Sequence, residues 1–453
     1  MVMISESAAC DAAGATEGGP CVDDSASQWT LEIGRERPSA PWWVEGASLC
    51  QPSMRVLEEG QSVVVGSGPS SELRIAERSV SATHCRLSLE SGRLVVRDLA
   101  SKNGVFVGGA RVQEAELGPG ASFIVGRVVL TCRPGSLRAP GDDLVAPPLP
   151  GFAGASLAVR RVTHEVRRVA NVKGPVLFRG ETGTGKDVLA RAMHATGPRR
   201  AGPFVPLNVA TLPRELADAE LFGHERGAYT GAHGAREGAF AQAHGGTLFL
   251  DEIAELAPDL QVKLLRVLED GEVRPIGGRV RRKVDVRVLS ATWAPLHQRV
   301  AEGRFRQDLY QRLAVFVIDV PPLRERRSDL PILAERFLHE IAPEVGHREL
   351  TAGALAKLAA YGWPGNVREL RNVLYRAAIS ASGAMLGTKE IAESLEISAA
   401  PRRIQVSSEQ ARAVVESHGG NVSAAARHLG VARSTFRDLL DGSRANQSNG
   451  DRD

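Results

Sequence analysis

A glycine-rich loop between an apolar stretch and a helical stretch constrains this chain more than any other feature. The segment PVLFRGETGTGKD, residues 175–187, predicts a buried strand, a loop and the start of a helix. Glycines let the backbone curl so that its N–H groups converge on an anion, and the helix N-terminus adds a favourable dipole. The G-x-x-x-x-G-K spacing in this context therefore predicts a site for the phosphates of ATP. We expect it to be lined by Gly180, Glu181, Thr182, Gly183, Thr184, Gly185, Lys186 and Asp187.

Two carboxylates follow a second buried strand. In GGTLFLDEI, residues 245–253, Asp251 and Glu252 come after four apolar or small residues. Such side chains emerge at the carboxyl edge of a parallel sheet, where nucleotides bind. Asp251 would hold Mg²⁺ and Glu252 would orient the attacking water. A bare Asp-Glu pair also serves as a helix cap, but beside a phosphate loop it favours ATP hydrolysis.

Composition excludes several classes of protein. Of the 453 residues, 43% are hydrophobic and 24% charged, as in ordinary soluble proteins, and the formal charge of +3 identifies no partner. No apolar run approaches the ~20 residues of a membrane helix, and no secretion signal is recognisable. We therefore expect a cytoplasmic protein without membrane contact. The five cysteines lack paired spacing and the histidines lack ligand spacing, which favours reduced thiols and no metal cluster of Cys or His.

The patterning predicts a multidomain chain: an all-β sandwich, an α/β P-loop domain with a helical lid, and an all-α helix-turn-helix. The strands expected in the sandwich lie in SVVVGS, CRLSLESGRLVVRDL, GVFVGGARV and ASFIVGRVVLTC. Those expected in the α/β domain are PVLF, FVPLNV, TLFL, VRVLSAT and VFVIDV. The expected boundaries are a disordered segment 1–45, the sandwich 46–133, a Pro/Gly linker 134–151, the α/β domain with lid 152–385, a linker 386–407, the helix-turn-helix 408–442 and a disordered tail 443–453.

Between about 151 and 385 the chain resembles a known family. The glycine loop, the Asp-Glu strand, FRQDLYQRL and WPGNVREL occur in the order typical of the AAA+ domain of bacterial enhancer-binding proteins, which activate sigma-54 RNA polymerase. The resemblance implies ring-shaped hexamers with ATP between subunits. Arg306 and Arg312 would reach a neighbour's γ-phosphate, and Arg368 would be a sensor in the lid. Asn208 would link Glu252 to a moving loop.

That loop is GAYTGA, which is similar to the G-A-F-T-G-A signature of this family. The resemblance implies that Tyr229 and Thr230 contact sigma-54, and an exposed ring on a glycine-rich tip is costly unless it binds something. The alternative is a plain surface hairpin. Tyrosine in place of phenylalanine keeps the ring, so we expect function to survive. The predicted contact residues are Gly227, Ala228, Tyr229, Thr230, Gly231 and Ala232.

One departure from the family pattern falls near the nucleotide. After DVRVLSAT the family usually has Asn as a γ-phosphate sensor, whereas this chain has Trp293. An indole cannot accept a hydrogen bond from water. We therefore expect altered sensing or coupling, with ATP binding less affected.

The C-terminal segment GGNVSAAARHLG resembles a Fis-type helix-turn-helix. Such a motif presents the start of its last helix to the major groove of DNA. Short helical pairs also act as dimerisation elements, which is the alternative here. The predicted DNA-binding residues are Arg433, Ser434, Thr435 and Arg437.

The N-terminal sandwich resembles a forkhead-associated (FHA) domain over about 50–133, on VGS, SATH and DLASKNG. The resemblance implies that Ser81 binds a phosphothreonine, His84 braces the loop and Asn103 grips the peptide backbone. The family's phosphate-binding Arg is replaced by Ser67, which removes a charge-assisted contact. The alternative is that the sandwich binds an unphosphorylated protein surface, or only packs on the AAA+ domain, the ATP-driven motor of the chain.

Together these resemblances imply a transcription activator. Its cofactors would be ATP and Mg²⁺, and its partners sigma-54 RNA polymerase, enhancer DNA and a phosphothreonine-containing protein or Ser/Thr kinase. It would assemble from dimer to hexamer, and without a receiver domain we expect no aspartate phosphorylation as input. Two rivals are an AAA+ remodeller of another class and a non-catalytic DNA-binding regulator with a decayed motor.

Overall fold

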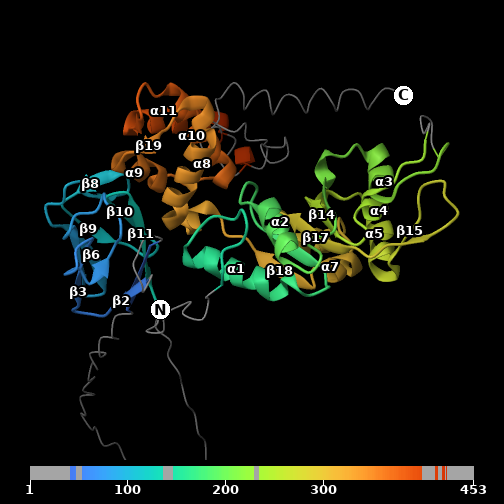
Figure 1. Ribbon diagram of the computed structural model, residues 1–453, viewed down its shortest axis with the longest axis horizontal. Helices are drawn as coiled ribbons and strands as arrows, with labels where there is room; N and C mark the ends of the chain where they lie inside the picture. Colours follow the sequence, from blue (N-terminus) through green and yellow to red (C-terminus); the bar gives the residue numbers. More distant parts are fainter. Residues whose placement is uncertain are drawn as a thin grey trace, which may run out of the picture. The chain divides into compact units, whose positions relative to one another are not determined.

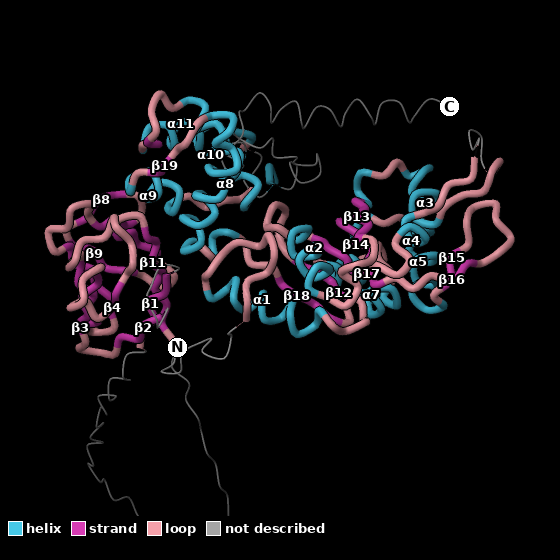
Figure 2. Tube along the Cα trace, in the orientation of Figure 1, coloured by secondary structure: helices cyan, strands magenta, loops and turns pink. Residues whose placement is uncertain are grey.

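Three folded parts follow one another along the chain: a β-sandwich, an α/β domain and a helical subdomain (Figures 1 and 2). The computed structural model describes residues 41–46, 54–135, 146–228, 234–399, 414–416, 421–423 and 425. The tip of the GAYTGA loop, 229–233, and almost all of the expected helix-turn-helix lie outside the described residues. Among the described helices, none is long and apolar enough to cross a membrane.

The sandwich consists of two mainly antiparallel sheets with strand orders β2-β1-β11-β10-β7-β8 and β4-β3-β5-β6-β9. Alternate side chains of both sheets meet in one core that includes Val65, Leu87, Val96 and Phe123, as strands with a two-residue side-chain period require. The strands are β1 (Trp42–Gly46), β2 (Met54–Leu57), β3 (Ser62–Gly66), β4 (Leu73–Arg74), β5 (Cys85–Glu90), β6 (Arg93–Asp98), β7 (Val105–Val107), β8 (Ala110–Val112), β9 (Glu114–Leu117), β10 (Ser122–Val125) and β11 (Val128–Pro134).

Two expected boundaries are wrong at their edges. The predicted disordered segment 1–45 overlaps β1, which pairs with β11 and buries Trp42 and Trp43. The predicted linker 386–407 overlaps a helix, Thr388–Ala399, whose Ile391 lies in the apolar core. Both segments are stabilised by distant partners, so their local sequence carries little signal.

The α/β domain is built on a parallel sheet of order β13-β14-β17-β12-β18. All five strands expected from the sequence are present. Separate apolar cores cover its two faces, which explains the near-continuous apolar runs of these strands. The elements are α1 (Leu157–Ala170), β12 (Val176–Arg179), α2 (Lys186–Thr196), β13 (Phe204–Asn208), η1 (Val209–Thr211), α3 (Arg214–Phe222), α4 (Ala239–Gln242), β14 (Thr247–Asp251), η2 (Ile253–Glu255), α5 (Pro258–Asp270), β15 (Glu272–Val273), β16 (Arg282–Lys283), β17 (Arg287–Thr292), α6 (Leu296–Ala301), α7 (Gln307–Leu313) and β18 (Phe316–Asp319).

The helical subdomain, the lid, packs around Trp363. Its indole is fully buried, donates from Nε1 to the Leu358 carbonyl at 2.8 Å and meets the Tyr361 ring edge-on. Two short turns, η3 (Leu323–Glu325) and η4 (Arg327–Asp329), lead into it. Its elements are α8 (Leu330–Val345), β19 (Glu349–Leu350), α9 (Ala352–Ala360), α10 (Asn366–Ser380), β20 (Met385–Leu386) and α11 (Thr388–Ala399).

Candidate functional site

The glycine loop joins β12 to α2 at the carboxyl edge of the sheet. Gly183 and Gly185 have φ of 80° and 99°, a left-handed conformation that favours glycine. A Cβ on Gly183 would clash with the carbonyl oxygen of Gly365, so the approach of the lid also requires glycine there. Lys186 begins α2, and its Nζ donates to the carbonyls of Gly180 at 2.8 Å and Glu181 at 3.2 Å. The loop therefore surrounds a buried ammonium group, as a phosphate cradle does.

Asp251 ends β14, and Glu252 follows it with a φ of 54°, unusual for a residue with a side chain. One Glu252 carboxylate oxygen, Oε2, is buried and has no hydrogen-bond partner among the residues that the structure describes. Burial raises the pKa values of the Asp251 and Glu252 carboxyls above the ordinary values of these groups, and the charge of Lys186 opposes this. Burial lowers the pKa of Lys186, against the attraction of Glu252 and Asp251. A partly desolvated trio of charges is typical of a catalytic site.

The donor set fits Mg²⁺, which is bound in proteins by one or two carboxylates together with substrate phosphates. Burial is the main cause of the raised pKa of Asp251, and the charge of Asp187 adds to it. Asp251 would hold the ion, and Asp187 stands where a hydroxyl is usual. When bound, Mg²⁺ neutralises the charge of the phosphates.

The lid grips the glycine loop through the start of α10. Asn366 is fully buried, and its Nδ2 donates to the Glu181 carboxylate at 3.0 Å and the Thr182 carbonyl at 3.1 Å. The Val367 N–H donates to the Gly183 carbonyl at 3.0 Å. The next residue, Arg368, lies beside the loop, and its charge acts on Lys186. No role was predicted for Asn366, although it is the last residue of the WPGN stretch.

The two arginines expected to reach a neighbour's γ-phosphate have other partners within their own chain. Arg306 precedes α7 and pairs with Asp308, Nη2 to Oδ2 at 2.7 Å, while Arg312 donates to the Leu268 carbonyl at 3.3 Å. Both side chains are exposed. The charges that most affect the pKa values of Lys186 and Asp251 include Arg368, whereas neither Arg306 nor Arg312 is among those that most affect Lys186, Asp251 or Glu252. Among the described residues, no hydrogen bond or ion pair joins the side chains of these arginines to the glycine loop, Asp251 or Glu252.

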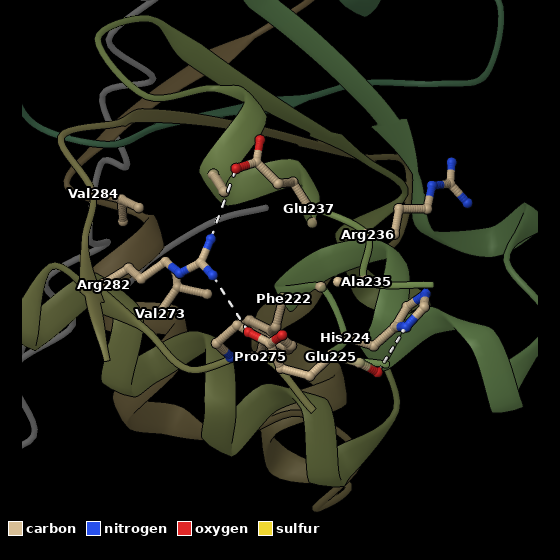
Figure 3. A pocket seen from close by; sticks show the side chains of 13 residues that line it. Phe222, His224, Glu225, Ala235, Arg236, Glu237, Val273, Pro275, Arg282 and Val284 are labelled. Carbon is tan, nitrogen blue, oxygen red and sulfur yellow. Dashed lines mark hydrogen bonds and ion pairs between the residues drawn. The ribbon is translucent and has the colours of Figure 1, made fainter. Parts of the chain in front are cut away.

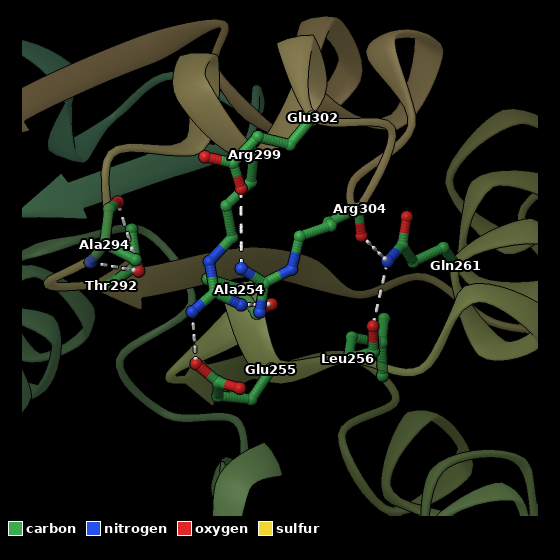
Figure 4. Close-up of polar contacts among 9 residues, drawn as sticks. All are labelled: Ala254, Glu255, Leu256, Gln261, Thr292, Ala294, Arg299, Glu302 and Arg304. Atoms are coloured by element: carbon green, nitrogen blue, oxygen red, sulfur yellow. Dashed lines mark hydrogen bonds and ion pairs between the residues drawn. The ribbon is translucent and has the colours of Figure 1, made fainter. Parts of the chain in front are cut away.

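A buried glutamine connects the two regions (Figure 4). Gln261 is 1% exposed; its Nε2 donates to the carbonyls of Leu256 at 2.8 Å and Arg304 at 3.2 Å. Its Oε1 accepts the Arg306 N–H at 2.9 Å. The segment after Glu252 and the segment carrying Arg306 are therefore tied together. No local sequence pattern indicates this role, because it depends on the packing of α5.

Asn208 and Trp293 flank the carboxylates. Asn208 is the register partner of Asp251, and its Oδ1 accepts the Ala210 N–H at 3.0 Å, capping η1. Trp293 follows β17 with its side chain 56% exposed. Its backbone N–H contributes to lowering the pKa of Glu252, against the larger effect of burial. The indole therefore does not fill the site.

The chain matches models of four known families. They are the sigma-54 interaction domain over residues 152–319, the AAA+ ATPase lid domain over 324–407, the FHA domain over 63–126 and the Fis family of bacterial regulatory proteins over 408–438.

Its relatives are bacterial regulators. It is 43% identical over 300 residues to the transcriptional regulatory protein ZraR of Salmonella typhimurium, covering 63% of this chain and 67% of that protein. The chain belongs to the sigma-54-dependent transcriptional activators. The Nif-specific regulatory protein of Rhodobacter capsulatus is 47% identical over 245 residues, 54% of this chain and 42% of that one. The crystal structure of NtrX from Brucella abortus in complex with ATP matches with a TM-score of 0.50 and 37% identity, covering 64% of this chain and 69% of that chain. As a family member, the chain is an ATP-binding AAA+ regulator of transcription with an FHA domain and a DNA-binding Fis-type region.

In this activator, ion pairs hold together the two ends of the GAYTGA loop, which we call its stem (Figure 3). His224 and Arg236 form an antiparallel bridge at its base. Arg282 from β16 pairs with Glu225 at 3.3 Å and Glu237 at 3.8 Å, one on each side of the stem. A hollow of about 250 Å³ lies beneath these pairs. The two ends of the loop are therefore fixed to each other and to the β15–β16 hairpin.

The activator's FHA domain brings its three predicted peptide-binding residues to one end of the sandwich. The buried His84 accepts the Ser81 N–H at Nδ1, 3.0 Å, and its Nε2 lies 3.1 Å from the Gly104 carbonyl. Since a carbonyl only accepts, Nε2 carries the proton and the ring is neutral; burial lowers the pKa of His84 accordingly. The Asn103 Nδ2 donates to the Ser79 carbonyl at 2.6 Å. Ser67, at the place of the expected Arg, donates to the Val80 carbonyl at 2.8 Å and so braces the same loop.

The predicted DNA-binding residues Arg433, Ser434, Thr435 and Arg437 lie outside the described residues, as do Tyr229, Thr230, Gly231 and Ala232 of the loop. Gly227 and Ala228 end the described part of the stem. Gly227 has a φ of 77°, so the chain turns there in a glycine conformation.

Proposed function

We propose that this activator hydrolyses ATP at sites shared between neighbouring subunits of a ring hexamer. The observation that carries the proposal is that the exposed Arg306 and Arg312 make their described contacts with Asp308 and the Leu268 carbonyl, and none with Lys186, Asp251 or Glu252. Exposed arginines that have no place in their own site are suited to complete a neighbour's, where they would stabilise the charge of the transferring phosphoryl group. Glu252 would orient the water and Asp251 would hold Mg²⁺.

We propose further that the GAYTGA loop delivers the energy of hydrolysis to sigma-54. The support is its stem, which Arg282 clamps beside β16, so that movement of the domain is transmitted to the tip. The Tyr229 ring and the Thr230 hydroxyl would make the contact.

Thr230→Ala should reduce recovery of a complex with sigma-54 by about tenfold or more when the ring is trapped with ADP and aluminium fluoride. The lost groups are a hydroxyl and a methyl at the centre of a small contact, where truncations cost most. The measurement is co-elution with sigma-54, with nucleotide binding followed on the same samples as the control. Equal recovery of wild type and variant would count against the loop as the contact.

The FHA domain would receive the signal as a phosphothreonine peptide. Ser81 would bond the phosphate and Asn103 the peptide backbone, with His84 as their brace. The exposed Lys102, whose N–H already donates to the Ser81 Oγ at 3.1 Å, would supply the cationic group that Ser67 does not.

Ser81→Ala should weaken binding of a phosphothreonine peptide by about tenfold, because a charge-assisted hydrogen bond is lost. The measurement is a pull-down on paired phosphorylated and unphosphorylated peptides. Ser88→Ala, on the outward face of β5, is the matched control and should bind as the wild type does. Recovery of Ser81→Ala equal to that of the control would end the phosphopeptide proposal.

The C-terminal Fis-type region would hold the activator at an enhancer through Arg433, Ser434, Thr435 and Arg437. Arginines at the start of a recognition helix suit base edges and phosphates of the major groove.

A further inference from the structure

Two strands of the FHA domain are apolar on both faces. In an antiparallel sandwich one face of each sheet packs on the core and the other usually meets water. In β10 and β11, Phe123 and Leu130 point into the sandwich core. Their neighbours Ile124 and Val129 point the other way, yet are only 2% and 0% exposed. These two are cross-strand partners and form a paired apolar patch on the outer face.

The cover of this patch is the lid. Ile124 and Val129 belong to the same apolar cluster as Leu355 and Ala359 of α9. Strands β7, β8 and β10 lie against α9, and β11 lies against α8 and η4. The continuous apolar runs SFIV and VVLTC in the sequence are thereby explained, since both faces need a partner.

A polar connection runs beside the patch, from the peptide loops to the lid. Asn103 donates to the Ser79 carbonyl, and the Ser79 Oγ accepts the Arg127 N–H at 2.8 Å. The Arg127 guanidinium then pairs with Glu349 of β19 at 2.7 Å. Gly126, with a φ of 63°, is pressed so closely on Ser79 that a Cβ would lie 2.5 Å from its carbonyl oxygen. Ser79 is therefore packed directly against the 126–127 segment.

The FHA domain also contacts the start of the α/β domain and one of the turns that lead into the lid. Arg133 donates to the carbonyl of Glu325 in η3 at 2.9 Å. Glu45, 4% exposed, accepts the Leu157 N–H at the start of α1 at 3.3 Å. Trp43 packs on Leu157. The FHA domain thus contacts the motor on both sides of the turns that lead into the lid.

We propose that the docked FHA domain is a splint that restrains the lid and slows ATP turnover. The lid carries Asn366 and Arg368 onto the glycine loop, so a restraint on the lid acts on the nucleotide site. A peptide that hydrogen-bonds to the Asn103 carboxamide would replace the hydrogen bond from Asn103 to the Ser79 carbonyl. The connection from Ser79 to Arg127 would then be weaker. Peptide binding would then weaken docking, and docking would weaken peptide binding by the same factor. The role of the peptide rests on the proposed function of the FHA domain, whereas the splint itself does not.

The first test is the charge pair. Arg127→Glu and Glu349→Arg should each raise ATP turnover of the full-length protein by about two- to fivefold, the range of a half-exposed pair. Combined, they restore the pair with its charges exchanged and should return turnover toward wild type. Arg93→Glu, which breaks the exposed Arg93–Glu116 pair on the other sheet, is the matched control and should leave turnover unchanged. Faster turnover in the control, or no return in the double variant, would overturn the splint.

The second test is the apolar patch. Ile124→Asp should shift the balance toward the undocked form by about tenfold or more, because a buried aliphatic contact is replaced by a charge. Turnover should rise further than with Arg127→Glu. Hydrogen exchange of β5 and β6 establishes that the sandwich remains folded. Turnover at or below the wild-type value with a folded sandwich would overturn the proposal, and Val129→Asp repeats the test from the partner strand.

A phosphothreonine peptide separates this inference from the proposed function. It should accelerate wild-type turnover, have no further effect on Ile124→Asp, and bind that variant more tightly. A peptide that binds both equally and changes neither turnover would overturn the coupling. Faster turnover of Ile124→Asp, with no peptide bound by either protein, would retain the splint and reject the phosphopeptide input.

Discussion

Glu252→Gln should slow ATP turnover by roughly two to three orders of magnitude, the usual contribution of a base that positions water. The amide keeps the size of the side chain and the position after β14, but it cannot accept a proton. ATP binding should remain, because Lys186 and the glycine loop are unchanged. The measurement is steady-state phosphate release together with equilibrium binding of ATP. Lys186→Ala is the contrasting variant and should lose binding itself. Turnover of Glu252→Gln within a factor of three of wild type would contradict the assigned role.

The pH dependence follows from the raised pKa of Glu252. Burial, the largest cause, favours the protonated acid, and only the ionised form acts on water. The acid limb of kcat/KM should therefore lie above the ordinary pKa of a glutamate. A raised folded-state pKa also means that stability from this carboxyl is present at low pH and is lost as pH rises through that pKa. At neutral pH, Glu252→Gln should melt at or above the wild-type temperature, and the difference should vanish in acid.

Trp363→Ala should destabilise the lid by about 3–5 kcal/mol, the cost of deleting a buried aromatic side chain. The indole fills the centre of the lid core and satisfies the Leu358 carbonyl. The same truncation at Trp293, which is 56% exposed, is the matched control and should change lid stability by less than about 1 kcal/mol.

Hydrogen exchange along α10 measures this effect, because it reports local opening of the lid even where the whole chain does not unfold in one step. Asn366 and Arg368 lie on α10, so ATP affinity should fall in parallel with protection. Trp363→Phe removes the hydrogen bond and part of the side-chain volume. Its hydrogen-exchange protection along α10 should lie between that of the wild type and that of Trp363→Ala. Unchanged protection in Trp363→Ala would show that the lid core does not depend on the indole.

Features with local patterns were predictable from the sequence. The glycine loop, the Asp-Glu pair and the five parallel strands each have their signal within about ten residues. The strand at Trp42–Gly46 and the helix at Thr388–Ala399 were missed because each is stabilised by segments far away in the chain.

The supporting residues were not predictable, since their roles arise only from packing. Gln261 is one polar residue in an amphipathic helix until α5 lies against the loop that carries Arg306. Ser79 is one serine in a turn until Arg127 and Asn103 are brought to it. The apolar runs of β10 and β11 did contain a signal for a second covered face, but not the identity of the helix that covers it.

The neutral, buried His84 has a consequence for what the protein reports. Because burial lowers its pKa and both ring nitrogens are engaged, this brace is protonated less readily than a free imidazole when its surroundings acidify. A signal read through such a loop would therefore depend on the covalent state of a partner more than on moderate changes in proton concentration.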